Sequence, residues 1–157
     1  MRCKLKNNAG VSFLEIMIVI AILGIIAVLV INPFTGFRNS QALSGTTEEI
    51  LSALQQARVK TLTAEGGSQY GVHFSNNQVV VFTGVTYNAS SPSNQNISLN
   101  SILTISSIDL TGGGADIIFQ KLTGATSQNG TVVVRLNSDM TQTKTITINS
   151  NGISDVN

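Results

Sequence analysis

Few residues of this chain have the types and spacing that enzyme chemistry requires. His73 is the only histidine and Cys3 the only cysteine, so neither has a second residue of its kind to complete a metal site. The run Gly112–Gly114 lacks the strand-to-helix context of a phosphate-binding loop, and no nucleophile motif is present. Four aspartates stand singly, without calcium-loop spacing: Asp109, Asp116, Asp139 and Asp155. We expect no catalysis, no cofactor and no metal, with His73 an ordinary strand residue.

One ionisable residue does stand in an unusual place. Glu15 is the only charged residue among the 21 residues from Val11 to Ile31. At about 1.5 Å per residue this run spans about 31 Å, which matches the hydrocarbon core of a bilayer. Its many apolar residues outweigh the cost of about 3 kcal/mol for one charge, so the run predicts a membrane-spanning helix. An ionisable group in such a span is usually kept for a partner, although a glutamate can also reach toward the headgroups.

Basic residues set the expected orientation of this helix. Arg2, Lys4 and Lys6 precede the apolar run, and only Arg38 follows it closely, which keeps the N-terminus in the cytoplasm. The chain after Ile31 is then exported. An ordinary secretory signal has a shorter apolar core followed by small residues, whereas here the small residues precede the core.

The order of these features resembles the prepilin signature of type IV pilins and type II secretion pseudopilins. The signature combines a short basic leader ending in Gly10, the residues Val-Ser-Phe-Leu-Glu from Val11 to Glu15, and a long apolar helix. The resemblance implies that a prepilin peptidase cleaves after Gly10, removing leader residues 1–10, and that Val11 is N-methylated. It also implies that Glu15 pairs with the terminal amine of a neighbouring subunit, and that a platform protein and an ATPase drive assembly.

Loss of the leader changes the composition of the mature chain. The 157 residues carry nine positive and eight negative charges, a net charge of +1. Removing Arg2, Lys4 and Lys6 leaves six positive and eight negative charges, a net charge of −2. A weakly acidic domain without a basic stripe is not expected to bind nucleic acid. Because Cys3 lies in the leader, the mature chain cannot form an internal disulfide.

A second helical pattern follows the apolar run. Apolar residues recur at helical spacing within Glu48–Ala64, which predicts an amphipathic helix. Thr46 and Glu49 have the spacing of a capping box that would restart the helix after Gly45. The pilin resemblance instead implies one extended helix, continued over residues 32–66 and stopped by Gly66-Gly67.

Beyond residue 67 the pattern becomes alternating, as in strands. About six strands are predicted in the β-rich region 67–157, with turns at Asn76-Asn77 and Asn151-Gly152. The predicted strands are Gln69–Ser75, Gln78–Val85, Ile97–Ile108, Asp116–Leu122, Thr131–Leu136 and Lys144–Asn149. The expected fold is therefore α+β: a long helix, half membrane-spanning (residues 11–31) and half amphipathic, packed on an antiparallel sheet.

The soluble region carries a narrower resemblance. The helix end Leu51–Arg58, the Ile-Ile-Phe segment near Phe119 and the terminal strands are similar to those of H-type minor pseudopilins and related minor pilins. The expected function is a structural filament subunit of the minor type, held first as a single-pass protein of the bacterial inner membrane with its C-terminal domain in the periplasm. The alternatives are a major type IV pilin for adhesion or motility, a DNA-uptake minor pilin, and an anchored binding domain that never polymerises.

Overall fold

The computed structural model describes residues 11–157, with the backbone alone for residues 29–35. The chain forms two compact units, Met1–Arg38 and Asn39–Asn157. Helix α1 (Phe13–Leu62) contributes to both units and includes Gly45, so no helix restarts after that glycine. This confirms the extended helix that the pilin resemblance implies. Gly10, the predicted cleavage position, lies outside the described residues.

In the second unit, α1 presents one apolar stripe. Ile50, Ala53, Leu54 and Ala57 are at most 2% exposed and follow the i, i+3, i+4, i+7 spacing of one helix face. Thr47 is buried near the start of this stripe, where its hydroxyl donates to the Leu43 carbonyl at 2.7 Å. The amphipathic helix predicted from sequence is thus confirmed.

The end of α1 is fixed by a threonine and a tight turn. The helix ends at Leu62, a few residues before the predicted stop at residue 66, because Ala64 adopts a left-handed φ of 49°. The 3-10 turn η1 (Glu65–Gly67) follows. Thr61 is fully buried, and its hydroxyl accepts a hydrogen bond from the Tyr70 backbone N–H at 2.9 Å. That bond fastens the first strand to the helix end.

Eight strands form two antiparallel sheets, instead of the six strands in one sheet predicted from sequence. The first sheet has the order β3-β2-β1-β5 and the second the order β4-β6-β7-β8. The strands are β1 (Tyr70–Ser75), β2 (Gln78–Thr83), β3 (Gln95–Ser98), β4 (Leu103–Leu110), β5 (Asp116–Ile118), β6 (Gly130–Leu136), β7 (Thr143–Ile148) and β8 (Ser154–Val156). The α+β class is confirmed, and the single sheet is corrected to two.

One asparagine explains much of this difference. The segment predicted as a single strand, Ile97–Ile108, is divided between β3 and β4, and so between the two sheets. Asn100 makes the turn: its side-chain oxygen accepts from the Ile102 N–H at 3.2 Å and its carbonyl from the Leu103 N–H at 2.9 Å. Such Asx turns redirect the backbone without any glycine or proline. Strand β8 was missed because it has only three residues.

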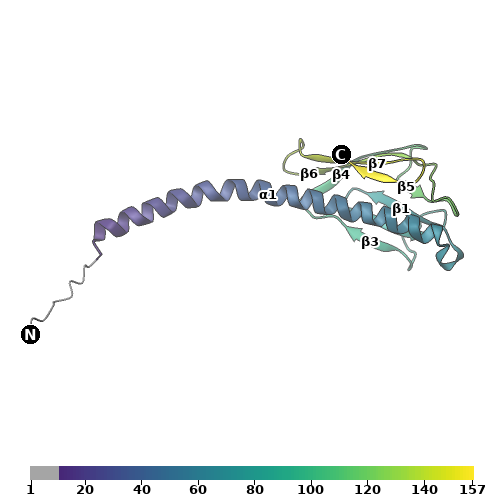
Figure 1. Ribbon diagram of the computed structural model, residues 1–157, viewed down its shortest axis with the longest axis horizontal. Coiled ribbons are helices and arrows are strands. Elements are labelled where there is room, and N and C mark those ends of the chain that lie inside the picture. Colours follow the sequence, from purple (N-terminus) through teal and green to yellow (C-terminus); the bar gives the residue numbers. More distant parts are fainter. Residues whose placement is uncertain (1–10) are drawn as a thin grey trace, which may run out of the picture. The chain divides into compact units, whose positions relative to one another are not determined.

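The main core lies between α1 and the inner faces of both sheets. The α1 stripe belongs to the same buried cluster as Phe74 and Ile117 of the first sheet and Val134 and Ile146 of the second. In Figure 1 the strands of both sheets run alongside the C-terminal part of α1. The predicted turn at Asn76-Asn77 joins β1 to β2, since Ser75 pairs with Gln78.

A smaller apolar cluster lies on the other face of the first sheet. Val80 and Phe82 are at most 1% exposed, yet both lie outside the main core. The Phe82 ring packs over Gly71, its partner across the β1–β2 ladder. A Cβ atom at position 71 would stand 2.5 Å from the ring and 2.6 Å from the Ile117 carbonyl oxygen. Only glycine allows this approach.

We predict that Gly71→Ala lowers the free energy of unfolding by about 1–3 kcal/mol, because the ring or strand β5 must move. The matched control is Gly114→Ala, where a Cβ would meet only the Asp116 backbone nitrogen at 3.9 Å. The control should change stability by less than about 0.5 kcal/mol. Urea unfolding of both variants measures the difference, and equal midpoints would contradict the close packing at Gly71.

Candidate functional site

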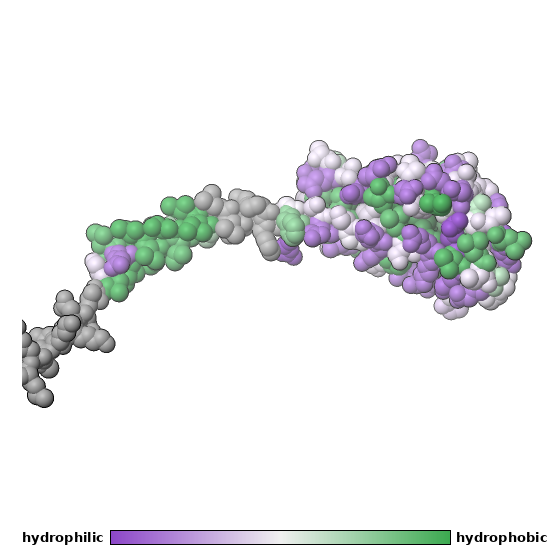
Figure 2. All heavy atoms as spheres, viewed as in Figure 1, coloured by the Kyte–Doolittle hydropathy of each residue, from purple (hydrophilic) through white to green (hydrophobic). Residues whose placement is uncertain are grey.

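The N-terminal part of α1 is apolar around its whole circumference. Val11 is 69% exposed, Phe13 78% and Leu14 66%, and the apolar side chains continue exposed to Val28. Figure 2 shows this unbroken apolar surface, with one polar patch near its beginning. A helix that is apolar on every side is normally buried by lipid or by other helices. This segment is therefore a surface that needs a partner.

Glu15 stands at the start of this apolar helix. It lies in the first turn of α1, beside the first helical hydrogen bond, from the Ile16 N–H to the Ser12 carbonyl at 3.2 Å. Its side chain is exposed. The positive end of the helix dipole stabilises a carboxylate there by about 0.3–1 kcal/mol. The carboxylate is thus held within one turn of Val11, the residue predicted to carry the new amino terminus.

The expected membrane span, residues 11–31, extends into the residues for which the structure gives only the backbone. Among the residues that the structure describes, no helix is both long and apolar enough to cross a membrane. Ala21, Gly24, Ile25 and Val28 line a shallow, open groove on one side of this helix. The two small residues form the depression, where another helix could approach closely.

His73 is the centre of a polar cluster on the outer face of the first sheet. Its Nδ1 lies 2.6 Å from Oδ1 of Asp116, which is its register partner on β5. Its Nε2 lies 3.1 Å from the hydroxyl oxygen of Ser75. The Tyr87 ring stacks on the imidazole, with ring centroids 3.9 Å apart and planes 6° from parallel. The Tyr87 ring also packs at an angle against the Phe82 ring, with centroids 5.6 Å apart. We call these four residues, His73, Ser75, Tyr87 and Asp116, the His73 cluster.

The sequence predicted that His73 is an ordinary strand residue, whereas the structure places its side chain in contact with Ser75, Tyr87 and Asp116. An Asp–His–Ser order of contacts is also that of a catalytic triad, but a triad further needs oxyanion donors and a substrate cavity. The contacts of the His73 cluster join β1, β5 and the loop after β2. The His73–Ser75 spacing of two was readable from sequence, whereas the pairing with Asp116 required the strand register.

The remaining aspartates are not gathered into a site. Within residues 11–157, no group of three or more histidine, cysteine, aspartate or glutamate side chains could hold a metal ion. Asp139 instead shapes a turn: its Oδ1 accepts from the Thr141 hydroxyl at 2.6 Å and from the Thr141 N–H at 3.0 Å. The bond from the Thr141 hydroxyl, and after it the bond from the Thr141 N–H, lower the pKa of the Asp139 carboxyl.

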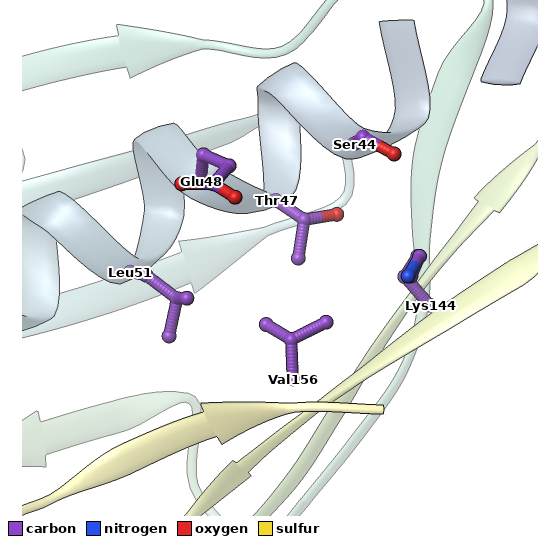
Figure 3. A pocket seen from close by; sticks show the side chains of 6 residues that line it. All are labelled: Ser44, Thr47, Glu48, Leu51, Lys144 and Val156. Carbon is purple, nitrogen blue, oxygen red and sulfur yellow. The ribbon is translucent and has the colours of Figure 1, made fainter. Parts of the chain in front are cut away.

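A small cavity lies between α1 and strands β7 and β8. Figure 3 shows Thr47, Leu51 and Val156 around it, with Glu48 on the helix side and Lys144 on the strand side. Its volume of about 90 Å³ suits a few water molecules, at about 30 Å³ each. Cofactor sites usually measure about 300–1,000 Å³, so this cavity is a packing space.

Arg58 connects the helix to two distant turns. Its Nε donates to the Gly124 carbonyl at 3.1 Å, and its Nη2 donates to the Asn151 carbonyl at 3.4 Å. Gly152 must be glycine here, because it has a φ of 77° and a Cβ would stand 1.9 Å from the Gly124 carbonyl oxygen. The predicted turn at Asn151-Gly152 is confirmed, since it joins β7 to β8. Arg58 holds this turn against the helix through its bond to the Asn151 carbonyl.

We predict that His73→Ala lowers the free energy of unfolding by about 1–2 kcal/mol, because both hydrogen bonds and the stacking are lost. The chain has no tryptophan and only two tyrosines, so tyrosine fluorescence in detergent should also report the release of Tyr87. Ser75→Ala is the control, because it removes one hydrogen bond and leaves the stack. Unchanged stability and fluorescence in His73→Ala would contradict a joining role for the cluster.

Comparison with known proteins agrees with this architecture. The family model described as "Type II transport protein GspH" matches residues 46–152, and the "Prokaryotic N-terminal methylation motif" matches residues 5–31. No curated protein sequence matches the chain. The crystal structure of the type IV minor pilin FimU of Pseudomonas aeruginosa has the same fold, with a TM-score of 0.56 and 15% sequence identity over 73% of this chain and 92% of that chain. This chain therefore belongs to the GspH family of type II transport proteins, among the pilins and pseudopilins.

Proposed function

We propose that this protein is a minor structural subunit of a type IV pilus-like or type II secretion filament. A prepilin peptidase removes residues 1–10 and the new terminus, Val11, is N-methylated. The helix over residues 11–31 holds the subunit in the bacterial inner membrane, with its C-terminal domain on the periplasmic side. A platform protein and an ATPase then transfer it to the filament, and the subunit itself performs no catalysis.

The observation that carries this proposal is the apolar helix with a single carboxylate at its start. From Val11 to Val28 the side chains are exposed in the single chain, and Glu15 alone among them is ionisable. The match to an N-terminal methylation motif over residues 5–31 supports the same use of this segment. A binding domain on a simple anchor would need neither a methylated terminus nor a carboxylate in its span.

The carboxylate supplies a reason for the helices to associate. Lipid tails are as apolar as leucine, so moving a helix from lipid to a helix bundle brings little hydrophobic gain. An unpaired carboxylate in the membrane, in contrast, costs about 3 kcal/mol. Val11 precedes Glu15 by four residues, about 6 Å along a helix, so a neighbouring subunit displaced by about one turn would bring its amine beside Glu15. The groove at Ala21 and Gly24 would admit the neighbouring helix to van der Waals contact.

We predict that Glu15→Ala leaves membrane insertion intact or improves it, because one charge is removed from the apolar segment. Incorporation into filaments should fall at least tenfold, because the partner amine loses a contact worth more than about 1.4 kcal/mol. The measurement compares the subunit in membranes with the subunit in sheared, purified filaments. Glu48→Ala, an exposed acid on the same helix, is the control and should incorporate normally. Equal incorporation of both variants would refute the assembly role of Glu15.

We predict that Gly10→Leu blocks processing, because the peptidase needs a small residue before the cut. The membrane protein should then retain residues 1–10, which intact mass and N-terminal sequencing detect directly. The unmodified chain should begin at methylated Val11. Normal maturation of Gly10→Leu would show that the cleavage site lies elsewhere.

A further inference from the structure

Strand β8 leaves one edge of the second sheet free. It stands last in the strand order and pairs with β7. Thr145 and Asn157 exchange two backbone hydrogen bonds of 3.0 Å. Because bonded and non-bonded pairs alternate along an antiparallel ladder, the backbone groups of Ser154 and Val156 point away from β7. Within residues 11–157, the backbone N–H and carbonyl groups of these two residues have no hydrogen-bond partner.

A groove follows this free edge, between β8 and α1. At one end lies the small cavity of about 90 Å³, across which the Leu51 and Val156 side chains point toward one another (Figure 3). At the other end, Val59 of the helix lines an open hollow together with Ile153 and Ser154. We call the cavity and the hollow together the β8 groove. Each end is thus bounded by one apolar residue of the helix and one of the last hairpin.

The helix side of the β8 groove is a row of side chains that the sheets of this chain leave partly uncovered. Leu51, Gln55 and Val59 follow one another at intervals of four residues, which places them in one row along α1. Leu51 is half-buried, whereas Gln55 is exposed and Val59 is 55% exposed. Leu51 and Val59 are eight residues apart, so the two apolar ends of the groove are about 12 Å apart along the helix.

The strand side of the groove adds one more polar group without a partner. The Ser154 hydroxyl oxygen is buried, and it makes no hydrogen bond to any residue from 11 to 157. Buried polar atoms in native proteins nearly always have a partner. A strand edge with unpaired backbone groups is also the template on which an extended peptide adds by backbone hydrogen bonds. Both features indicate a surface that another backbone completes.

We propose that the β8 groove binds an extended segment of a different protein, which continues the second sheet beyond β8. A strand rises about 3.3 Å per residue, and alternate side chains face the same way. Residues i and i+4 of the segment are therefore about 13 Å apart, which matches the distance between the two apolar ends of the groove. The segment carries an apolar residue at each of these positions. The one that enters the cavity is small and aliphatic, since an apolar cavity that holds benzene measures about 150 Å³.

The edge strands of this chain do not fit that description. Strands β3, β5 and β8 have three or four residues, so none of them holds two residues four positions apart. Strand β4 is longer, but its residues Leu103, Ile105 and Leu110 are already buried in the core. A different protein is therefore the source of the segment.

The charges at the groove favour an acidic segment. Arg58 and Lys144 line the groove, and Glu48 is the only acidic residue that lines it, so these side chains sum to a charge of +1. Complementary charges across a contact favour the matching partner. The segment therefore carries an acidic residue beside its apolar ones. The contact uses neither Val11 nor Glu15, so it does not depend on the proposed filament function.

Synthetic peptides test strand addition to the purified full chain in detergent micelles. The probe is Thr-Val-Thr-Ser-Thr-Val-Asp, in which the valines lie four positions apart. Because the N–H groups of alternate strand residues point to the same side, N-methylation of both valines, or of the second and third threonines, removes donors from one side only. One methylated peptide should bind at least tenfold more weakly than the probe, and the other about equally. Slowed amide exchange at Ser154 and Val156 measures binding. Equal effects of both methylations, or no binding of the probe, would overturn strand addition.

A proline at position 156 tests the same bonds from the side of the protein. Val156→Pro removes one outward N–H and leaves the β7–β8 ladder intact, because this N–H does not bond to β7. The probe should bind this variant about tenfold more weakly, since one hydrogen bond is lost and its acceptor is left unpaired. Val156→Thr keeps the N–H and nearly the same shape, so it is the control with unchanged binding. Equal affinities of the two variants would contradict the contact, and the methylated peptides decide the matter if Val156→Pro does not fold.

Cross-linking in cells identifies the source of the segment. The exposed Gln55 lies between the two apolar ends of the groove, and p-benzoylphenylalanine in its place reacts with whatever occupies the groove. Sequencing of the cross-linked peptide should give a segment of another protein with apolar residues four positions apart. Val156→Pro should reduce the product at least tenfold. A cross-link to a second copy of this chain, or to a helical segment that Val156→Pro does not affect, would refute the proposal.

The outcomes also separate this contact from the filament function. Probe binding by a chain that is absent from purified filaments would support strand addition and remove the proposed filament function. A chain that is present in filaments but does not bind the probe would leave the filament function standing and remove strand addition.

Discussion

The burial of one helical stripe is the constraint on which the second unit depends. Side chains of both sheets lie in one buried cluster with the helix residues Ile50, Ala53, Leu54 and Ala57. The two sheets and the helix therefore bury their apolar faces against one another. The Thr61–Tyr70 hydrogen bond then fixes where the first strand leaves the helix. The strand registers follow, because a slip of one residue would turn Phe74 or Val134 away from the stripe.

The same helix carries a second and different kind of apolar surface. Up to Val28 its exposed side chains are apolar on every side, whereas from Ile50 only one face is apolar and that face is already covered. Burial therefore has to come from other molecules in the first unit and from the chain's own sheets in the second. Membership of the GspH family is consistent with this division, since the family match covers residues 46–152 and the methylation motif covers residues 5–31.

Sequence reasoning succeeded where a period or a short motif carries the information. The amphipathic helix, the turns at Asn76-Asn77 and Asn151-Gly152 and the α+β class are local in origin. The division into two sheets was missed because Asn100 turns the chain through its side chain, in a stretch whose residue types favour a strand throughout. The His73 cluster and the Arg58 contacts were missed because their partners are distant in sequence. The roles of Gly10, Val11 and Glu15 depend on other proteins and remain predictions.

The contacts of Arg58 also indicate the order in which parts of the domain fold. Gly124 and Asn151, which accept the hydrogen bonds, lie 66 and 93 residues after Arg58, so the loops that these bonds close are long. Contacts of such high sequence separation form late, after local helix and hairpin formation. The Asn151 turn can bind Arg58 only when nearly all of the globular sequence is available to fold. A chain whose last hairpin has not yet folded therefore lacks the contacts that Arg58 makes at the end of α1.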